Sequence, residues 1–154
     1  MHNEHSSPDS IFEPLDAGIR EIRLLIIRPS LDIDDPVVCR LIKGSLDDDS
    51  QYYALSYTWG TSDNPSLITI NDTPWVVGPN LHDALKYLRL EDKAITLWVD
   101  AICINQKDDS EKSYQVAMMA DIYRKARGVR AWIGLPETDE EVDKADGSAC
   151  DWDV

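Results

Sequence analysis

Four polar residues follow one apolar segment at spacings that could serve a binding site. The segment, Ile95–Val99, has the length and composition of a buried strand. It is followed by Asp100, Asn105, Gln106 and Glu111. In a sheet whose strands are linked by helices, small ligands bind at the carboxyl ends of the strands. A carboxylate there can stabilise a positive charge that develops in a reaction. We therefore expect a site where this strand ends.

Each of these four residues also has a structural explanation. Asp108 and Glu111 have the spacing of a capping box, so Glu111 can simply stabilise the first turn of a helix. Asp100 can cap the turn after the strand by accepting backbone N–H groups. Asn105 and Gln106 can shape that turn instead of contacting a ligand. The sequence alone leaves these alternatives open.

A second predicted strand, Tyr52–Thr58, runs into aromatic residues. Tyr57 and Trp59 could stack on a flat ligand ring, and Gly60 would let the backbone approach that ligand closely. Alternation along the strand also allows Leu55, Tyr57 and Trp59 to face the core. We expect at least one of the two aromatic side chains to belong to the core.

Cysteine and histidine give no recognisable metal or nucleophile site. Cys39, Cys103 and Cys150 are widely spaced and form neither a disulfide framework nor a C-x-x-C pair. Cys103 lies in the apolar run Ala101–Ile104, where a free thiol is commonly buried and inert. None of the three histidines has a partner at zinc-ligand spacing. We predict no metal and a reducing, cytoplasmic location.

Length and charge restrict the class of partner. The chain has 154 residues, 43% of them hydrophobic, which is typical of one globular domain. Its net charge of −14 disfavours binding of nucleic acid or of an anionic membrane through a broad basic face. No apolar run approaches the ~20 residues that span a bilayer. We expect neither nucleic acid nor membrane as a partner.

The periodicity of apolar residues predicts the fold class. The second half alternates helix, strand, helix, strand, and strands joined through helices are normally parallel with right-handed crossovers. We predict an α/β domain with a mainly parallel central sheet flanked by helices and a β-rich N-terminal addition. Residues 1–18 are expected to form a flexible arm, 19–136 the domain and 137–154 an acidic tail. The predicted strands are Ile22–Ile27, Val37–Ile42, Tyr52–Thr58, Leu67–Ile70, Trp75–Val77, Ile95–Val99 and Val129–Ile133, with helices from Asn80 and from Asp108 to Gly128. The residues between the fourth and fifth strands, Asn71-Asp72-Thr73-Pro74, have the pattern of a hairpin turn. Asn80 is the expected N-cap of the first helix, whose apolar face is Leu81, Ala84, Leu85 and Leu88, and the apolar stripe of the second helix includes Tyr123.

Several blocks of the sequence resemble the fungal heterokaryon-incompatibility (HET) domain family. Tyr53–Gly60, YALSYTWG, is similar to the family's "ALSYxWG" signature. Leu97–Gln106, LWVDAICINQ, matches its "LWxDAICINQ" block, and Asn80–Leu85 matches its "NLxxAL" helix. The matching blocks occur in the family's order over roughly residues 22–134. A series of separate blocks is far more specific than one short motif.

This resemblance implies a signalling domain that triggers programmed cell death in fungal non-self recognition. HET domains are thought to be distant relatives of TIR domains, which implies a TIR-like, flavodoxin-like sheet. Some TIR domains cleave the nicotinamide–ribose bond of NAD with a Glu on the element after a central strand. The resemblance thereby implies Glu111 as the catalytic residue, although Gln115 could be the aligned position. The residues expected to bind the NAD substrate are Tyr57, Trp59, Gly60, Asp100, Asn105 and Gln106.

A non-enzymatic function is the alternative. The domain could act through homotypic assembly or partner binding, as a homo-oligomer controlled by an upstream sensor or oligomerisation region outside this chain. HET proteins are often longer than this sequence, which is consistent with such a region lying elsewhere. The NAD glycohydrolase hypothesis requires no cofactor, because NAD would be the substrate.

Overall fold

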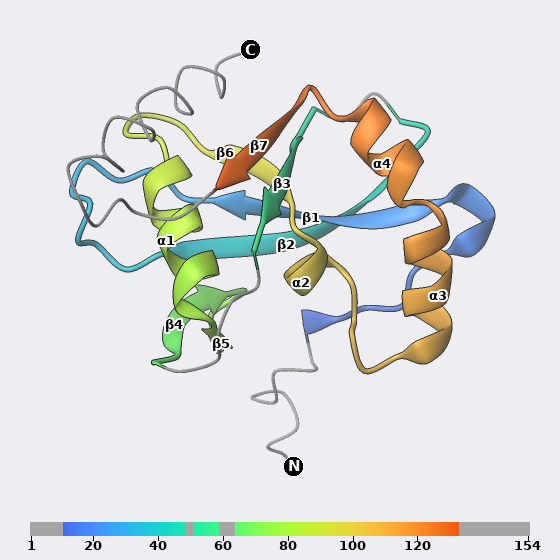
Figure 1. Cartoon of the computed structure of the whole chain (residues 1–154), viewed down its shortest axis with the longest axis horizontal. Coiled ribbons are helices and arrows are strands. Elements are labelled where there is room, and N and C mark those ends of the chain that lie inside the picture. Colours follow the sequence, from blue (N-terminus) through green and yellow to red (C-terminus); the bar gives the residue numbers. More distant parts are fainter. Residues whose placement is uncertain (1–10, 49–50, 59–63, 133–154) are drawn as a thin grey trace.

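One mixed seven-stranded sheet forms the centre of the computed structural model, which describes residues 11–48, 51–58 and 64–132 (Figure 1). The order of strands across the sheet is β5-β4-β2-β1-β6-β3-β7. Loops join some neighbouring strands, whereas the helices link strands that are not neighbours in the sheet. The strands are β1 (Glu21–Ile27), β2 (Val38–Ser45), β3 (Tyr53–Tyr57), β4 (Ser66–Ile70), β5 (Thr73–Val77), β6 (Ile95–Trp98) and β7 (Gly128–Trp132).

The prediction of a mainly parallel, helix-flanked α/β sheet was wrong. The central strand β1 is antiparallel to both of its neighbours, β2 and β6, and β4 is antiparallel to β5. Parallel pairing is confined to β3 with β6 and β7, and to a short ladder between β2 and β4. The crossover rule holds only where a helix links two strands, whereas β1 and β2 are joined by a short loop that permits antiparallel pairing.

The C-terminal half keeps part of the expected geometry. β6 and β7 point in the same direction, because both are parallel to β3. They are not neighbours, however, since β3 lies between them and Tyr53 is in register with both Leu97 and Gly128. A strand from the first half has therefore been inserted between the two strands that the helical pattern links.

Within the described residues four helices lie over the sheet, with α1 and the α3–α4 pair on opposite sides of α2 in Figure 1. They are α1 (Pro79–Leu88), α2 (Asp100–Cys103), α3 (Asp109–Ala117) and α4 (Met119–Lys125), and a 3₁₀ turn (Ala17–Ile19) precedes β1. α1 buries the predicted face of Leu81, Ala84, Leu85 and Leu88. Its N-cap is Gly78 rather than the predicted Asn80. The helix expected over 108–127 is interrupted at Met118.

The strand β1 is buried on both faces, which explains its nearly continuous apolar sequence EIRLLII. Leu25 and Ile27 are fully inaccessible to solvent, as are Leu97 and Trp98 of β6. After Glu21 at the start of the strand, Arg23 is the other charged residue of β1, and it is only 1% exposed. A charge in such a position requires a partner, because an unpaired buried ion is strongly unfavourable. In the described part of the chain, no helix has both the length and the apolarity to cross a membrane.

Candidate functional site

Tyr57 and Asp100 lie at one edge of the sheet. Tyr57 is the last residue of β3, and Asp100 opens α2 two residues after β6 ends. Because β3 and β6 are parallel neighbours, their carboxyl ends lie at the same edge. Asp100 is close enough to Tyr57 and to Tyr123 of α4 for its charge to act on both phenols. We call Tyr57, Asp100 and Tyr123 the rim cluster.

Burial and negative charge keep the rim tyrosines protonated. Burial is the larger cause that raises the pKa of Tyr57, and the Asp100 carboxylate and Tyr123 raise it further. Burial and Asp100 also raise the pKa of Tyr123. Both phenols consequently remain hydrogen-bond donors well above neutral pH, beside a half-buried carboxylate. Sequence reasoning placed Tyr123 in the apolar stripe of a helix and missed its proximity to Asp100.

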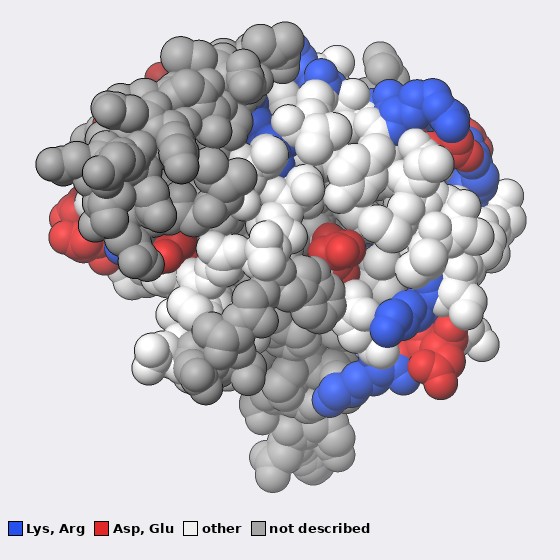
Figure 2. All heavy atoms as spheres, in the orientation of Figure 1, with Lys and Arg blue, Asp and Glu red and all other residues white. Residues whose placement is uncertain are grey.

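An apolar groove of about 210 Å³ adjoins this cluster. Near the centre of Figure 2 one acidic spot lies in a largely uncharged part of the visible surface. The groove is smaller than the roughly 300–1,000 Å³ of typical small-molecule sites, so it suits a single ring rather than a whole dinucleotide. Its lining residues are Tyr57, Trp75, Val76, Val77, Gly78, Leu81, Ala101 and Ile102.

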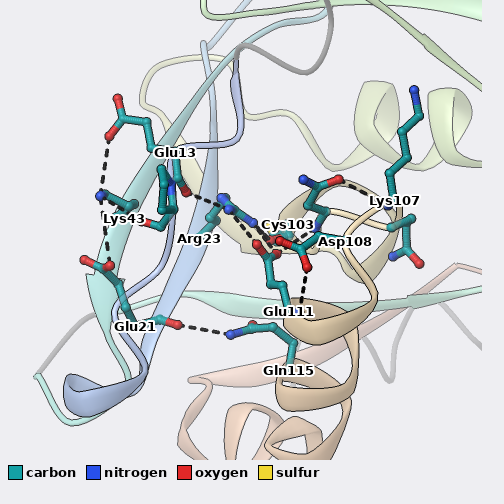
Figure 3. A network of polar contacts seen from close by, with 12 residues as sticks. Glu13, Glu21, Arg23, Lys43, Cys103, Lys107, Asp108, Glu111 and Gln115 are labelled. Atoms are coloured by element: carbon teal, nitrogen blue, oxygen red, sulfur yellow. Dashed lines mark hydrogen bonds and ion pairs between the residues drawn. The ribbon is translucent and has the colours of Figure 1, made fainter.

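Glu111 is held in a bidentate ion pair with the buried Arg23 (Figure 3). Arg23 Nη1 lies 2.6 Å from Oε2, and Nη2 lies 2.9 Å from Oε1. The backbone N–H of Asn105 also donates to Oε2, at 2.7 Å. The side chains of Arg23 and Glu111 are only 2% and 10% exposed. Both carboxylate oxygens are thus engaged inside the protein.

Arg23 extends this pair into a network that we call the clamp. Its guanidinium donates to the carbonyl of Cys103 at the end of α2 and to the carbonyl of Glu13, at 3.0 and 2.7 Å. The Phe12 ring lies 4.9 Å from the guanidinium carbon and packs edge-on against Trp75 of the groove. One buried arginine therefore connects β1, α2, α3 and the segment before β1.

The loop residues Asn105 and Gln106 hold the backbone between α2 and α3. Asn105 Oδ1 accepts the N–H of Lys107 at 3.2 Å, and Gln106 Nε2 donates to the carbonyl of Asp100 at 2.8 Å. Asp108 caps α3 by accepting the N–H of Glu111 at 3.1 Å. The Glu111 side chain does not complete the reciprocal bond of a capping box, because Arg23 and Asn105 occupy it.

Tyr57 and Glu111 were expected to lie at one site, but they line different hollows. Tyr57 lines the groove beside α2, whereas Glu111 lines another hollow together with Pro14 and Tyr114. Trp59 and Gly60 lie outside the described residues. Their proposed part in binding, like the catalytic role of Glu111, stays a prediction.

The thiol of Cys103 is buried and poorly reactive. It is fully inaccessible, and burial raises its pKa to about 12. Its sulfur accepts the N–H of Val99 at 3.3 Å, which fixes the turn between β6 and α2. A thiol that is protonated at neutral pH and sealed from solvent is a poor nucleophile.

Sequence reasoning missed Arg23 and Gln115 as parts of the clamp region. Gln115 is fully buried, and its Nε2 donates to the carbonyl of Glu21 at 3.1 Å. The available signal was Arg23 itself, a charge within an apolar strand. Such a charge predicts a buried acidic partner, and only the fold identifies Glu111 as that partner.

Comparisons with known proteins support one family. Residues 52–150 match the model of the family described as "Heterokaryon incompatibility protein (HET)". "Heterokaryon incompatibility protein 6, OR allele" of Neurospora crassa is 36% identical over 132 residues, which cover 77% of this chain and 19% of that protein. This chain therefore spans about a fifth of the length of that relative. No solved structure matches the chain significantly. The resemblance seen in the motif blocks is confirmed, and the chain belongs to the HET family.

Proposed function

We propose that this chain is a signalling domain of fungal heterokaryon incompatibility, in which recognition of non-self ends in programmed cell death. Its membership of the HET family supports this proposal, as does the name of its Neurospora relative. Most of that relative lies outside the alignment, so recognition of non-self is assigned to regions beyond this domain.

The proposal rests on one observation: the two sequence blocks that most resemble the HET family lie next to each other in the sheet. β3 carries most of the YALSYTWG block, β6 begins the LWVDAICINQ block, and the two strands are paired. This pairing places Tyr57 and Asp100, which are far apart in the sequence, at the same edge of the sheet, where Tyr57 lines the groove. We therefore assign the signalling output to the rim cluster.

The chemical step that we propose for the rim is hydrolysis of NAD. The bond between the nicotinamide nitrogen and C1′ of its ribose breaks, and the electron pair leaves with nicotinamide. Water adds to C1′ and releases a proton to solvent, which gives ADP-ribose. A carboxylate can stabilise the positive charge that develops on the ribose, and we propose Asp100 for this role because it lies at the carboxyl end of β6 near Tyr57. The proposal rests on this chemistry, because the mixed sheet gives no architectural support for transfer from TIR domains.

Glu111 enters this proposal as a positioning residue. To stabilise a ribosyl cation directly, its carboxylate would have to leave Arg23 and the Asn105 N–H. In its observed position it fixes the end of α2 through Arg23, whose guanidinium also binds the Cys103 carbonyl. We therefore expect NAD turnover to depend directly on the charge of Asp100, whereas Glu111 affects turnover only through the stability of the protein and the position of α2.

An assembly module without catalysis is the second candidate, favoured by an apolar pair at the sheet edge. Leu67 of β4 and Val76 of the edge strand β5 are cross-strand partners that are 61% and 62% exposed. Two such neighbours form an apolar patch that another molecule could cover. In this case cell death would depend on the patch and not on Asp100.

One experiment separates the two candidates. The purified chain is incubated with NAD at high protein concentration, and free nicotinamide is measured for the parent, Asp100→Asn and the matched control Asp92→Asn, which alters an exposed turn. The NAD proposal expects nicotinamide release by the parent and control, and a roughly 10²–10³-fold lower rate for Asp100→Asn. Absence of nicotinamide release by the parent, even when it is fused to an oligomerising partner, contradicts the NAD step.

Cell death is scored in parallel, after regulated expression of the same variants in a fungal strain. The signalling proposal expects the parent to reduce viability. The assembly candidate expects Leu67→Ser to abolish killing while Asp100→Asn retains it, and the NAD candidate expects the reverse. If neither the parent nor its oligomerised form reduces viability, the signalling proposal is contradicted.

A further inference from the structure

A basic pocket lies at the opposite end of β3, β6 and β7 from the rim cluster. Tyr53 and Ile95, the first residues of β3 and β6, line it together with Arg127, which directly precedes β7. Arg130 of β7 and Lys93 complete its positive charge. The hollow measures about 450 Å³, within the roughly 300–1,000 Å³ of small-molecule sites.

The charge of this pocket is opposite in sign to the net charge of the chain. The protein carries a net charge of −14, yet Lys93, Arg127 and Arg130 share one hollow, and none of its described lining residues is acidic. Like charges placed close together repel, and a bound anion relieves that repulsion. In Figure 2 basic atoms are visible at the top of the molecule, near the start of β7.

The two guanidinium groups are positioned by the sheet. The guanidinium carbon of Arg130 lies 4.2 Å from the centre of the Tyr53 ring, and that of Arg127 lies 6.0 Å from the same centre. The Arg127 backbone N–H donates to the Tyr52 carbonyl at 2.8 Å, and its side chain donates to Gln51 Oε1. Planar guanidinium groups held in this way are preorganised for paired hydrogen bonds to phosphate oxygens.

Beside the cations the pocket has an apolar wall and two uncharged polar groups. Leu90, Ala94 and Ile95 form the wall, and Gln51 and Thr96 supply the polar groups. This combination matches a molecule with an anionic end and an uncharged, partly flat end.

We propose that this pocket binds a small phosphate-bearing molecule of nucleotide size. Its phosphates contact Arg127, Arg130 and Lys93, and its uncharged part packs on the apolar wall. The site is distinct from the rim cluster, because the two lie at opposite ends of the same strands. The proposal is therefore independent of NAD hydrolysis.

Calorimetric titration of the full chain tests the ligand class. The probes are inorganic pyrophosphate, ADP and adenosine, so that the phosphates and the ring are examined separately. We expect pyrophosphate and ADP to bind, ADP more tightly, with affinities that fall as salt is added, and adenosine to bind far more weakly. Failure of both phosphates to bind at millimolar concentration overturns the proposal, as does adenosine binding as tightly as ADP.

Substitutions test the location. Arg130→Gln should weaken ADP binding roughly 10- to 100-fold, the range expected for loss of a charge-assisted hydrogen bond. Arg40→Gln is the matched control, because Arg40 is an exposed arginine of β2 that does not line the pocket. Lys93→Gln alters an exposed residue outside the sheet and should weaken ADP binding several-fold without disturbing the fold. Unchanged affinity in both pocket variants, or equal loss in Arg40→Gln, overturns the assignment.

Discussion

The clamp and the rim cluster each contain one carboxylate from the same stretch of sequence, yet their surroundings are opposite. Glu111 is sealed against the buried Arg23, with both oxygens engaged. Asp100 is half-buried at the open edge of the sheet, beside an apolar groove and two protonated tyrosines. One carboxylate holds elements together, and the other lies beside the groove residue Tyr57, where we propose that a ligand binds.

The difference shows that residue type and spacing do not assign a role to an acidic residue. From sequence, Glu111 was the sharper catalytic candidate, because the family resemblance implied a catalytic Glu on the element after a central strand. The buried counter-charge of Glu111 comes from β1, far away in the sequence, so the fold and not the local spacing gives Glu111 its structural role. The groove and the clamp are in contact through Phe12, whose ring packs against both Arg23 and Trp75.

The largest expected effect comes from breaking the clamp with Glu111→Gln. This change leaves the Arg23 charge buried without its counter-ion, and loss of one partner of a buried pair typically costs about 3–5 kcal/mol of unfolding free energy. A glutamate that only stabilised a helix terminus would cost about 0.3–1 kcal/mol. Chemical denaturation of the parent and variant measures the difference.

Asp109→Asn is the matched control for this substitution, because it removes an exposed charge from the same first turn of α3. Its unfolding free energy should stay within about 1 kcal/mol of the parent's value. If the two variants are equally stable, Glu111 is not part of a strong buried pair and the comparison with Asp100 fails.

A smaller effect is expected when both charges of the clamp are removed. Arg23→Met combined with Glu111→Gln takes away the unpaired charge along with its partner, so the double variant should regain about 1–3 kcal/mol relative to Glu111→Gln alone. Recovery should be incomplete, because the carbonyls of Cys103 and Glu13 lose their donor. A complete cycle of the two single variants and the double variant gives the coupling energy. Strictly additive losses would show that the two charges do not interact.

Local patterns in the sequence predicted local structure well. The apolar face of α1 was correct, and the turn between β4 and β5 fell at the expected Asn71 and Asp72, whose positive φ angles suit a tight hairpin. Asp108 is the N-cap of α3, as its spacing with Glu111 indicated. These features depend on residues that are near one another in the chain.

The order of strands could not be predicted in this way. The insertion of β3 between β6 and β7 and the two antiparallel neighbours of β1 depend on contacts between distant segments. The rim pair of Tyr57 and Asp100 nevertheless came together, because both residues follow strands that are parallel neighbours. The clamp could not be predicted, because Arg23 and Glu111 are far apart in the sequence and nothing in the sequence indicates that they form an ion pair.

The smallest effect on stability, and the sharpest contrast with the clamp, is expected for Asp100→Asn. This substitution keeps the shape of the side chain and removes a partly solvated charge, so we expect the unfolding free energy near neutral pH to change by less than about 1 kcal/mol. It should also lower the pKa values of Tyr57 and Tyr123, since the Asp100 charge helps to raise both.

The raised pKa values of these two tyrosines also determine how the stability of the protein depends on pH. A phenol whose pKa is higher in the folded state holds its proton while the unfolded chain loses it, so stability falls as pH rises above about 10. In Asp100→Asn this alkaline fall should be shallower, whereas in Asp92→Asn it should match the parent. Spectrophotometric titration of the tyrosines and denaturation over alkaline pH provide the two measurements. An unchanged tyrosine titration would mean that Asp100 does not act on the rim phenols, and the contrast between the two carboxylates would then lose its electrostatic basis.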